Sequence, residues 1–324
     1  MALTCNGYVV DADTVGTLEP ATHLLDDPSG LREAMNEHGY LFLPGLLAPE
    51  LVLDARREIL TKYAIIGEID DRGLDGTGSV MDGIVAEPTG LESVNLRAFS
   101  ASVRSGLAYR RVVEHERLLG MYRALLDGEV HCFDFRWPRF VRPGEGCGFH
   151  CDGPYMNRAT ETIYSSWIPL GAVSPVEGAL MILGDSHDNQ ALHEGYLAKD
   201  ADRDGLVWLD DDPEVVRRNY GSTWLTADFR PGDVLCFTMD TLHGAFDNQT
   251  DPGRCRLSSD TRYQRADEPC DDRWNGLDHL GQVEGHGGSR VFYPGLGRWQ
   301  NADFQDEWKY VDEQGRLVMP EAAP

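Results

Sequence analysis

Hydrophobic positions near the start of the chain follow a helical spacing, and a short apolar run comes next. Apolar residues at positions 25, 31 and 35 fall roughly one helical turn or two apart, and Gly39 is a residue type that commonly ends helices. The uninterrupted apolar run at 40–43 predicts a short buried strand. Pro49 then opens a second predicted helix, because proline is well tolerated at the first helical position.

Two further stretches complete the predicted N-terminal part. The Gly- and Asp-rich residues 67–92 contain only isolated apolar positions and predict a long loop, of a kind that often serves as a lid or binding loop. A helical pattern follows at about 107–127. We therefore expect residues 21–128 to form a helical cap with a lid loop.

From about residue 129 the pattern changes to short apolar runs separated by Gly, Pro and Asp. Many short strands at such spacing indicate a sandwich or barrel. The runs lie at 130–133, 162–164, 167–170, 179–182 and 234–237. We predict a mainly β fold with a helical cap (α+β), in which 129–265 form the core, 187–230 a polar, partly helical insertion, and 266–324 an aromatic-rich C-terminal extension. All 324 residues are expected to form one domain.

Charge and composition narrow the possible partners. Acidic residues outnumber basic ones by 54 to 29, giving a formal charge of −25, which argues against binding to nucleic acids or anionic membranes. No stretch approaches the ~20 apolar residues of a membrane helix, and the N-terminus shows no secretory pattern. The seven cysteines include no Cys-x-x-Cys pair. We expect a cytoplasmic monomer or homodimer that acts on a small molecule.

The candidate chemistry lies in the stretch Gly148-Phe149-His150-Cys151-Asp152-Gly153. In an extended strand, residues i and i+2 share a face, so His150 and Asp152 are expected to reach one metal ion together. The same alternation directs Cys147 and Cys151 away from that face. His243, after the run at 234–237, is the candidate third ligand. Two imidazoles and one carboxylate suit non-haem Fe(II) and leave coordination positions open.

Several motifs in one order make this pattern specific. They are Gly39-Tyr40-Leu41-Phe42-Leu43-Pro44-Gly45, His150-x-Asp152, Gly184-Asp185-Ser186-His187, Pro231-Gly232-Asp233 leading to His243, and Arg254-Cys255-Arg256-Leu257-Ser258. With them the chain resembles the phytanoyl-CoA dioxygenase family of Fe(II)- and 2-oxoglutarate-dependent oxygenases over roughly residues 30–265. The resemblance implies a double-stranded β-helix, also called a jelly-roll or cupin-like barrel. It also implies that His150, Asp152 and His243 bind iron.

The resemblance further implies an arginine that binds the far carboxylate of 2-oxoglutarate. Arg254 has the expected distance from His243, whereas Arg256 and Ser258 fit the family's Arg-x-Ser strand pattern. Alternation places all three on one face, so periodicity does not decide, and we favour Arg256 with Ser258 as its helper. Trp167 matches a tryptophan that lines the 2-oxoglutarate site in the family, although it is equally consistent with plain barrel core.

The implied reaction consumes 2-oxoglutarate and O2, releases succinate and CO2, and oxidises a small metabolite, in a biosynthetic pathway by our hypothesis. Asp152 favours hydroxylation, desaturation, epoxidation or rearrangement, since related halogenases lack this carboxylate. The segments 67–92, 187–230 and 266–324 are expected to shape the substrate site. Two alternatives stay open: a cupin-like metal-dependent isomerase or hydrolase that does not use 2-oxoglutarate, and a non-catalytic metal-binding barrel.

Overall fold

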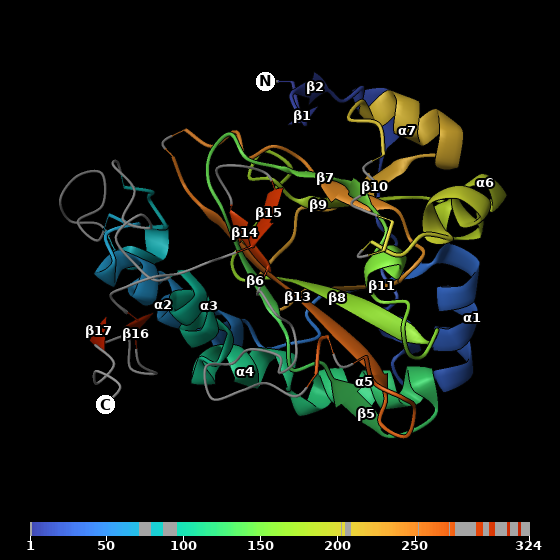
Figure 1. The fold of residues 1–324 in the computed structure, drawn as a ribbon, viewed down its shortest axis with the longest axis horizontal. Coiled ribbons are helices and arrows are strands. Elements are labelled where there is room, and N and C mark those ends of the chain that lie inside the picture. Colours follow the sequence, from blue (N-terminus) through green and yellow to red (C-terminus); the bar gives the residue numbers. More distant parts are fainter. Residues whose placement is uncertain are drawn as a thin grey trace.

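Two β-sheets packed face to face form the centre of the molecule (Figure 1). The computed structural model describes residues 2–70, 79–86, 96–201, 203–204, 209–251, 253–271, 273–275 and four short strands beyond them. The larger sheet contains, in spatial order, β4 (Tyr40–Leu43), β11 (Val234–Thr238), β8 (Ile163–Pro169), β13 (Arg256–Arg265) and β5 (Val130–Cys132), with β6 (Trp137–Val141) also paired to β13. The smaller sheet contains β3 (Val15–Thr17), β10 (Trp224–Thr226), β9 (Leu180–Leu183), β12 (His243–Ala245) and β7 (Cys147–His150). This arrangement confirms the predicted mainly β, double-stranded β-helix fold.

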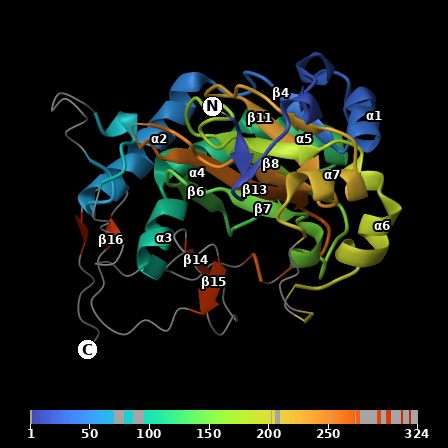
Figure 2. The same ribbon diagram turned by 90° about the horizontal axis from the view of Figure 1, so that it is seen from above.

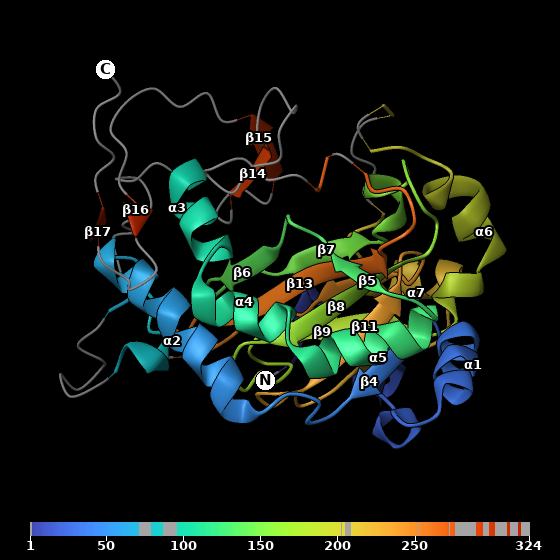
Figure 3. The same cartoon turned by 90° about the horizontal axis from the view of Figure 1, so that it is seen from below.

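Helices cover the outer face of the larger sheet (Figure 3). They are α1 (Pro28–His38), α2 (Pro49–Ile65), α3 (Leu96–Arg104), α4 (Leu107–Val113) and α5 (Glu116–Leu126). The short α6 (Gln190–Leu192) and α7 (Pro213–Tyr220) lie at the end of the molecule near α1 (Figure 2). No helix in the described part of the chain has the length and apolar character needed to cross a membrane.

Short strands remain outside the two sheets. At the N-terminus, β1 (Thr4–Cys5) pairs with β2 (Tyr8–Val9). Near the C-terminus, β14 (Arg290–Tyr293) pairs with β15 (Arg298–Asn301), and β16 (Tyr310–Val311) with β17 (Leu317–Val318). Most of the predicted aromatic extension, and residues 71–78 and 87–95 around the predicted lid loop, lie outside the described residues.

Two apolar layers explain the strand sequences. Along β4, Leu41 and Leu43 pack toward the helices, whereas Tyr40 and Phe42 pack into the space between the sheets. Strand β11 alternates in the same way. Because both faces of the larger sheet are covered at β4 and β11, these two strands are apolar at nearly every position instead of alternating with polar residues.

The structure adds detail at three places that the sequence pattern did not predict. The single helix expected at 107–127 is two helices, α4 and α5, because the chain leaves the helix at Glu114 and the His115 side chain caps the second one. Strand β3 precedes the predicted start of the cap. Strand β10, in which Trp224 is fully buried, lies inside the predicted insertion and pairs in parallel with β3.

Candidate metal centre

Three side chains from the edge of the smaller sheet meet at one point. His150 ends β7 and is the cross-strand partner of His243, the first residue of β12. Asp152 follows two residues after β7. One potential ligand atom from each of the three lies within 4.8 Å of the other two, and the two imidazole centroids are 4.2 Å apart. The predicted triad therefore comes together.

The backbone conformation that brings Asp152 to the two histidines differs from the predicted one. Its backbone has φ −74° and ψ −23°, which is helical, so the chain has already left the strand at this residue. The carboxylate reaches the two imidazoles because the backbone turns, and not because residues 150 and 152 share a strand face.

Backbone carbonyls fix the orientation of both imidazoles. His150 Nδ1 lies 2.9 Å from the Gly148 carbonyl oxygen, and His243 Nδ1 lies 3.0 Å from that of Thr241. Since a carbonyl only accepts, each Nδ1 carries a hydrogen, and Nε2 is the atom that each neutral ring offers to a metal. Burial, and then the neighbouring His150, lower the pKa of His243 to about 4, so this ring is neutral at neutral pH.

The carboxylate of Asp152 is held ionised. Burial alone raises its pKa, but the Arg262 guanidinium, the two imidazoles and the Ser165 hydroxyl together bring the pKa well below its usual range. Two imidazole nitrogens and one carboxylate oxygen are a donor set that fits Fe(II).

Comparison with known proteins assigns the chain to a family. The sequence model of phytanoyl-CoA dioxygenase matches residues 35–255, which include the whole triad. The chain belongs to the phytanoyl-CoA dioxygenase family. The protein is accordingly an enzyme of the non-haem iron- and 2-oxoglutarate-dependent oxygenase class, which disfavours both alternatives left open by the sequence.

Two named hydroxylases and one solved structure are similar to the chain. The chain is 27% identical over 267 residues to 1-deoxypentalenic acid 11-beta-hydroxylase of Streptomyces arenae, covering 78% of this chain and 87% of that one. The Streptomyces exfoliatus enzyme of the same name is 25% identical, with the same coverage. The solved structure of the epimerase SnoN with Fe3+, alpha ketoglutarate and nogalamycin RO aligns with TM-score 0.51 at 18% identity, over 86% of this chain and 97% of that one. That likeness shows a common fold.

The two arginines that the family motif leaves open occupy different environments. Arg256 begins β13, is only 3% exposed, and its Nη1 donates to the Ser258 hydroxyl at 2.5 Å. Its Nε is buried without a hydrogen-bond partner within the described residues. Arg254 precedes the strand, bridges to Ile84 through its backbone, and is exposed.

Trp167 lies in the middle of β8 on its inner face. It is 1% exposed, and its ring contacts that of Phe229 edge-on with centroids 4.7 Å apart. The structure thus places Trp167 in the packed layer between the sheets. Its contribution to 2-oxoglutarate binding stays a prediction.

Four polar residues beside the triad were not predicted from the sequence. Arg262 of β13 and Ser165 of β8 both contact the carboxylate of Asp152. Next to them, Arg139 of β6 forms an ion pair with Asp260 of β13. The triad from the smaller sheet therefore faces a charged surface built by the larger sheet.

The prediction that Cys147 points away from the face of the metal ligands was also wrong. The pairing of β7 with β12 shifts register between His243 and Ala245, which breaks the alternation that was expected to turn this thiol away. Burial alone raises the pKa of Cys147, but His150 and Arg139 outweigh it and lower the pKa. In contrast, Cys151 is fully buried as predicted.

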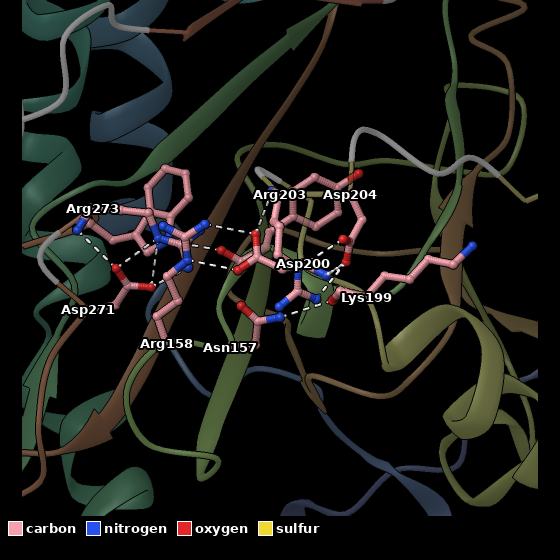
Figure 4. A network of polar contacts seen from close by, with 10 residues as sticks. Asn157, Arg158, Lys199, Asp200, Arg203, Asp204, Asp271 and Arg273 are labelled. Carbon is pink, nitrogen blue, oxygen red and sulfur yellow. Dashed lines mark hydrogen bonds and ion pairs between the residues drawn. The ribbon is translucent and has the colours of Figure 1, made fainter.

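The loop after the triad's aspartate is anchored by charged contacts (Figure 4). Arg158 makes a two-pronged ion pair with Asp200, with both N–O distances 2.8 Å. Beside it, Asn157 donates to the Lys199 carbonyl at 3.0 Å. These contacts connect the segment that follows the metal centre to the region predicted as an insertion.

Proposed function

We propose that this enzyme hydroxylates a small, largely apolar metabolite, with iron bound by His150, Asp152 and His243. The observation that carries the proposal is the convergence of these three side chains, with Nδ1 of both imidazoles hydrogen-bonded to a backbone carbonyl and the carboxylate ionised. Iron held there would supply the activation of O2 and the oxidation of a C–H bond. The co-products are succinate and CO2 from 2-oxoglutarate.

Arg256 is proposed to bind the far carboxylate of 2-oxoglutarate, with Ser258 beside it. Burial lowers the pKa of Arg256 to about 10, so the side chain remains charged at neutral pH. Its buried Nε lacks a partner among the described residues, and a carboxylate is the group that satisfies such a donor best. Arg254 is too exposed to provide a water-excluded carboxylate site.

An aromatic group beside the triad supports an apolar substrate. The Tyr155 ring lies 6.3 Å from that of His150, and Trp137 and Trp274 lie 5.3 Å apart between centroids. Trp274 Nε1 donates to the Tyr155 carbonyl at 3.2 Å, and the three aromatic side chains pack against one buried apolar cluster. Since the curated relatives are named for hydroxylating 1-deoxypentalenic acid, an organic acid similar to that compound is the substrate class to test first.

The test is aerobic turnover with Fe(II), 2-oxoglutarate and a panel of candidate substrates headed by 1-deoxypentalenic acid. We expect succinate in amounts equal to a hydroxylated product whose new oxygen comes from isotopically labelled O2. The His243→Ala variant is the control and should form neither. If no panel member raises succinate formation above the level without substrate, the proposed substrate class is wrong. A rearranged product without added oxygen would contradict hydroxylation.

A further inference from the structure

The two oxygens of the Asp152 carboxylate have different surroundings. Oδ2 accepts hydrogen bonds from Ser165 Oγ at 2.5 Å and from Arg262 Nη2 at 2.6 Å. Oδ1 instead faces His150, with its Nε2 3.9 Å away. A carboxylate oxygen offers about two lone-pair positions, so both positions on Oδ2 are already taken.

We infer that Arg262 and Ser165 restrict Asp152 to binding the metal through Oδ1 alone. The inference rests on the proposed iron site. A triad of this kind leaves open positions for the co-substrate and O2. A second metal bond from Oδ2 would occupy one of them. Arg262 is thus a positioning residue that keeps a coordination position free for 2-oxoglutarate or O2.

The setting of Arg262 is unfavourable for a purely structural role. The side chain is 3% exposed, and its Nε and Nη1 have no hydrogen-bond partner in the described part of the chain. Leaving two donors of a buried guanidinium unpaired costs folding free energy. The Trp137 ring, whose centroid is 4.4 Å from the guanidinium carbon, offsets part of that cost. The favourable polar contact of this buried guanidinium is the one with Asp152.

The Ser165 hydroxyl is the second donor to Oδ2. Ser165 is fully buried on β8, next to β13 in the larger sheet, so both donors come from one rigid surface. Asp152 comes from the turn after a strand of the smaller sheet. The larger sheet therefore fixes the rotation of a carboxylate that the smaller sheet provides.

The test compares Arg262→Met with wild type in two anaerobic titrations. Methionine keeps similar length and apolar volume but removes the charge and the donors. We expect Fe(II) to bind at least as tightly, because a positive charge is lost and Oδ2 becomes available. We expect the affinity of the Fe(II)-loaded protein for 2-oxoglutarate, followed by the visible absorption of the chelate, to fall about tenfold or more. Arg262→Lys, which keeps a charged donor, should recover part of it.

The matched control is Arg265→Met, on the same strand but paired with Asp267 at the surface, and it should match wild type in both titrations. Equal 2-oxoglutarate affinity in Arg262→Met and wild type would overturn the inference, as would parallel losses of metal and 2-oxoglutarate binding in a folded variant. If Arg262→Met does not fold, Ser165→Ala should show the same split to a smaller degree, and no split there would overturn the inference. Absence of chelate absorption in wild type would instead count against the proposed function.

Discussion

Replacing Arg256 by methionine should weaken 2-oxoglutarate binding far more than the same change at Arg254. Hydrogen bonds that involve a charged group contribute about 1.5–3 kcal/mol each. Arg256 has one donor already directed to Ser258 and a buried Nε without a partner in the described residues, so it can give 2-oxoglutarate one or two such bonds. A loss of about 2–4 kcal/mol corresponds to roughly 30- to 1,000-fold weaker binding.

The assay is the 2-oxoglutarate dependence of the chelate absorption in the anaerobic Fe(II) protein, measured for wild type, Arg256→Met and Arg254→Met. Arg254 is exposed and ahead of the strand, so its variant should stay within about twofold of wild type. Metal binding without 2-oxoglutarate should be unchanged in both, which separates a co-substrate effect from misfolding. A larger loss in Arg254→Met than in Arg256→Met would refute the reasoning.

Three other outcomes test packing and metal binding. Gly39→Ala should lower the free energy of unfolding by about 2–4 kcal/mol in a urea titration, because φ is +74° and the new Cβ lies 2.6 Å from the His187 ring; an unchanged midpoint would refute this. Tyr122→Phe should cost about 1–2 kcal/mol by removing its buried 2.8 Å hydrogen bond to Ser166, and a neutral result would mean that this bond adds nothing. Fe(II) at about 100 times its dissociation constant should stabilise the protein by about 2.7 kcal/mol in an anaerobic thermal melt, and His243→Ala should lose that gain; equal gains would exclude His243 as a ligand.

Strands β4 and β11 of the larger sheet were predictable because they are buried on both sides. Runs such as 40–43 and 234–237 stand out in any sequence, since neither face allows polar residues. Strand β3 and its partner β10 were not predicted, for a different reason. Each is three residues long, and their pairing joins positions that are about 200 residues apart in the chain, which no local pattern records.

The three metal-ligand residues were predictable from their motif, but the side chains that hold Asp152 were not. His150, Asp152 and His243 follow a spacing specific to the family, whereas the contact between Asp152 and Arg262 joins two sheets across 110 residues. A signal was nevertheless present. Inward positions 256, 258, 260 and 262 of β13 are all polar or charged, which is unusual for a strand facing a barrel interior.

The choice between Arg254 and Arg256 shows where periodicity fails. Both arginines fall on the same strand parity, so alternation treats them as equivalent. They differ because β13 begins at Arg256, and Arg254 lies before it at the surface. Where a strand begins depends on its partners, here Val141 of β6 opposite Arg256, and not on the local sequence.

The most direct test of the iron site is an anaerobic titration of the intact protein with Fe(II) and 2-oxoglutarate. The proposed ligands predict a weak visible absorption band from the 2-oxoglutarate chelate, at one equivalent of iron per chain, and its disappearance in His150→Ala. An intact, folded protein that shows no band, or a band that persists unchanged in His150→Ala, would contradict the assignment of His150, Asp152 and His243 as the iron ligands.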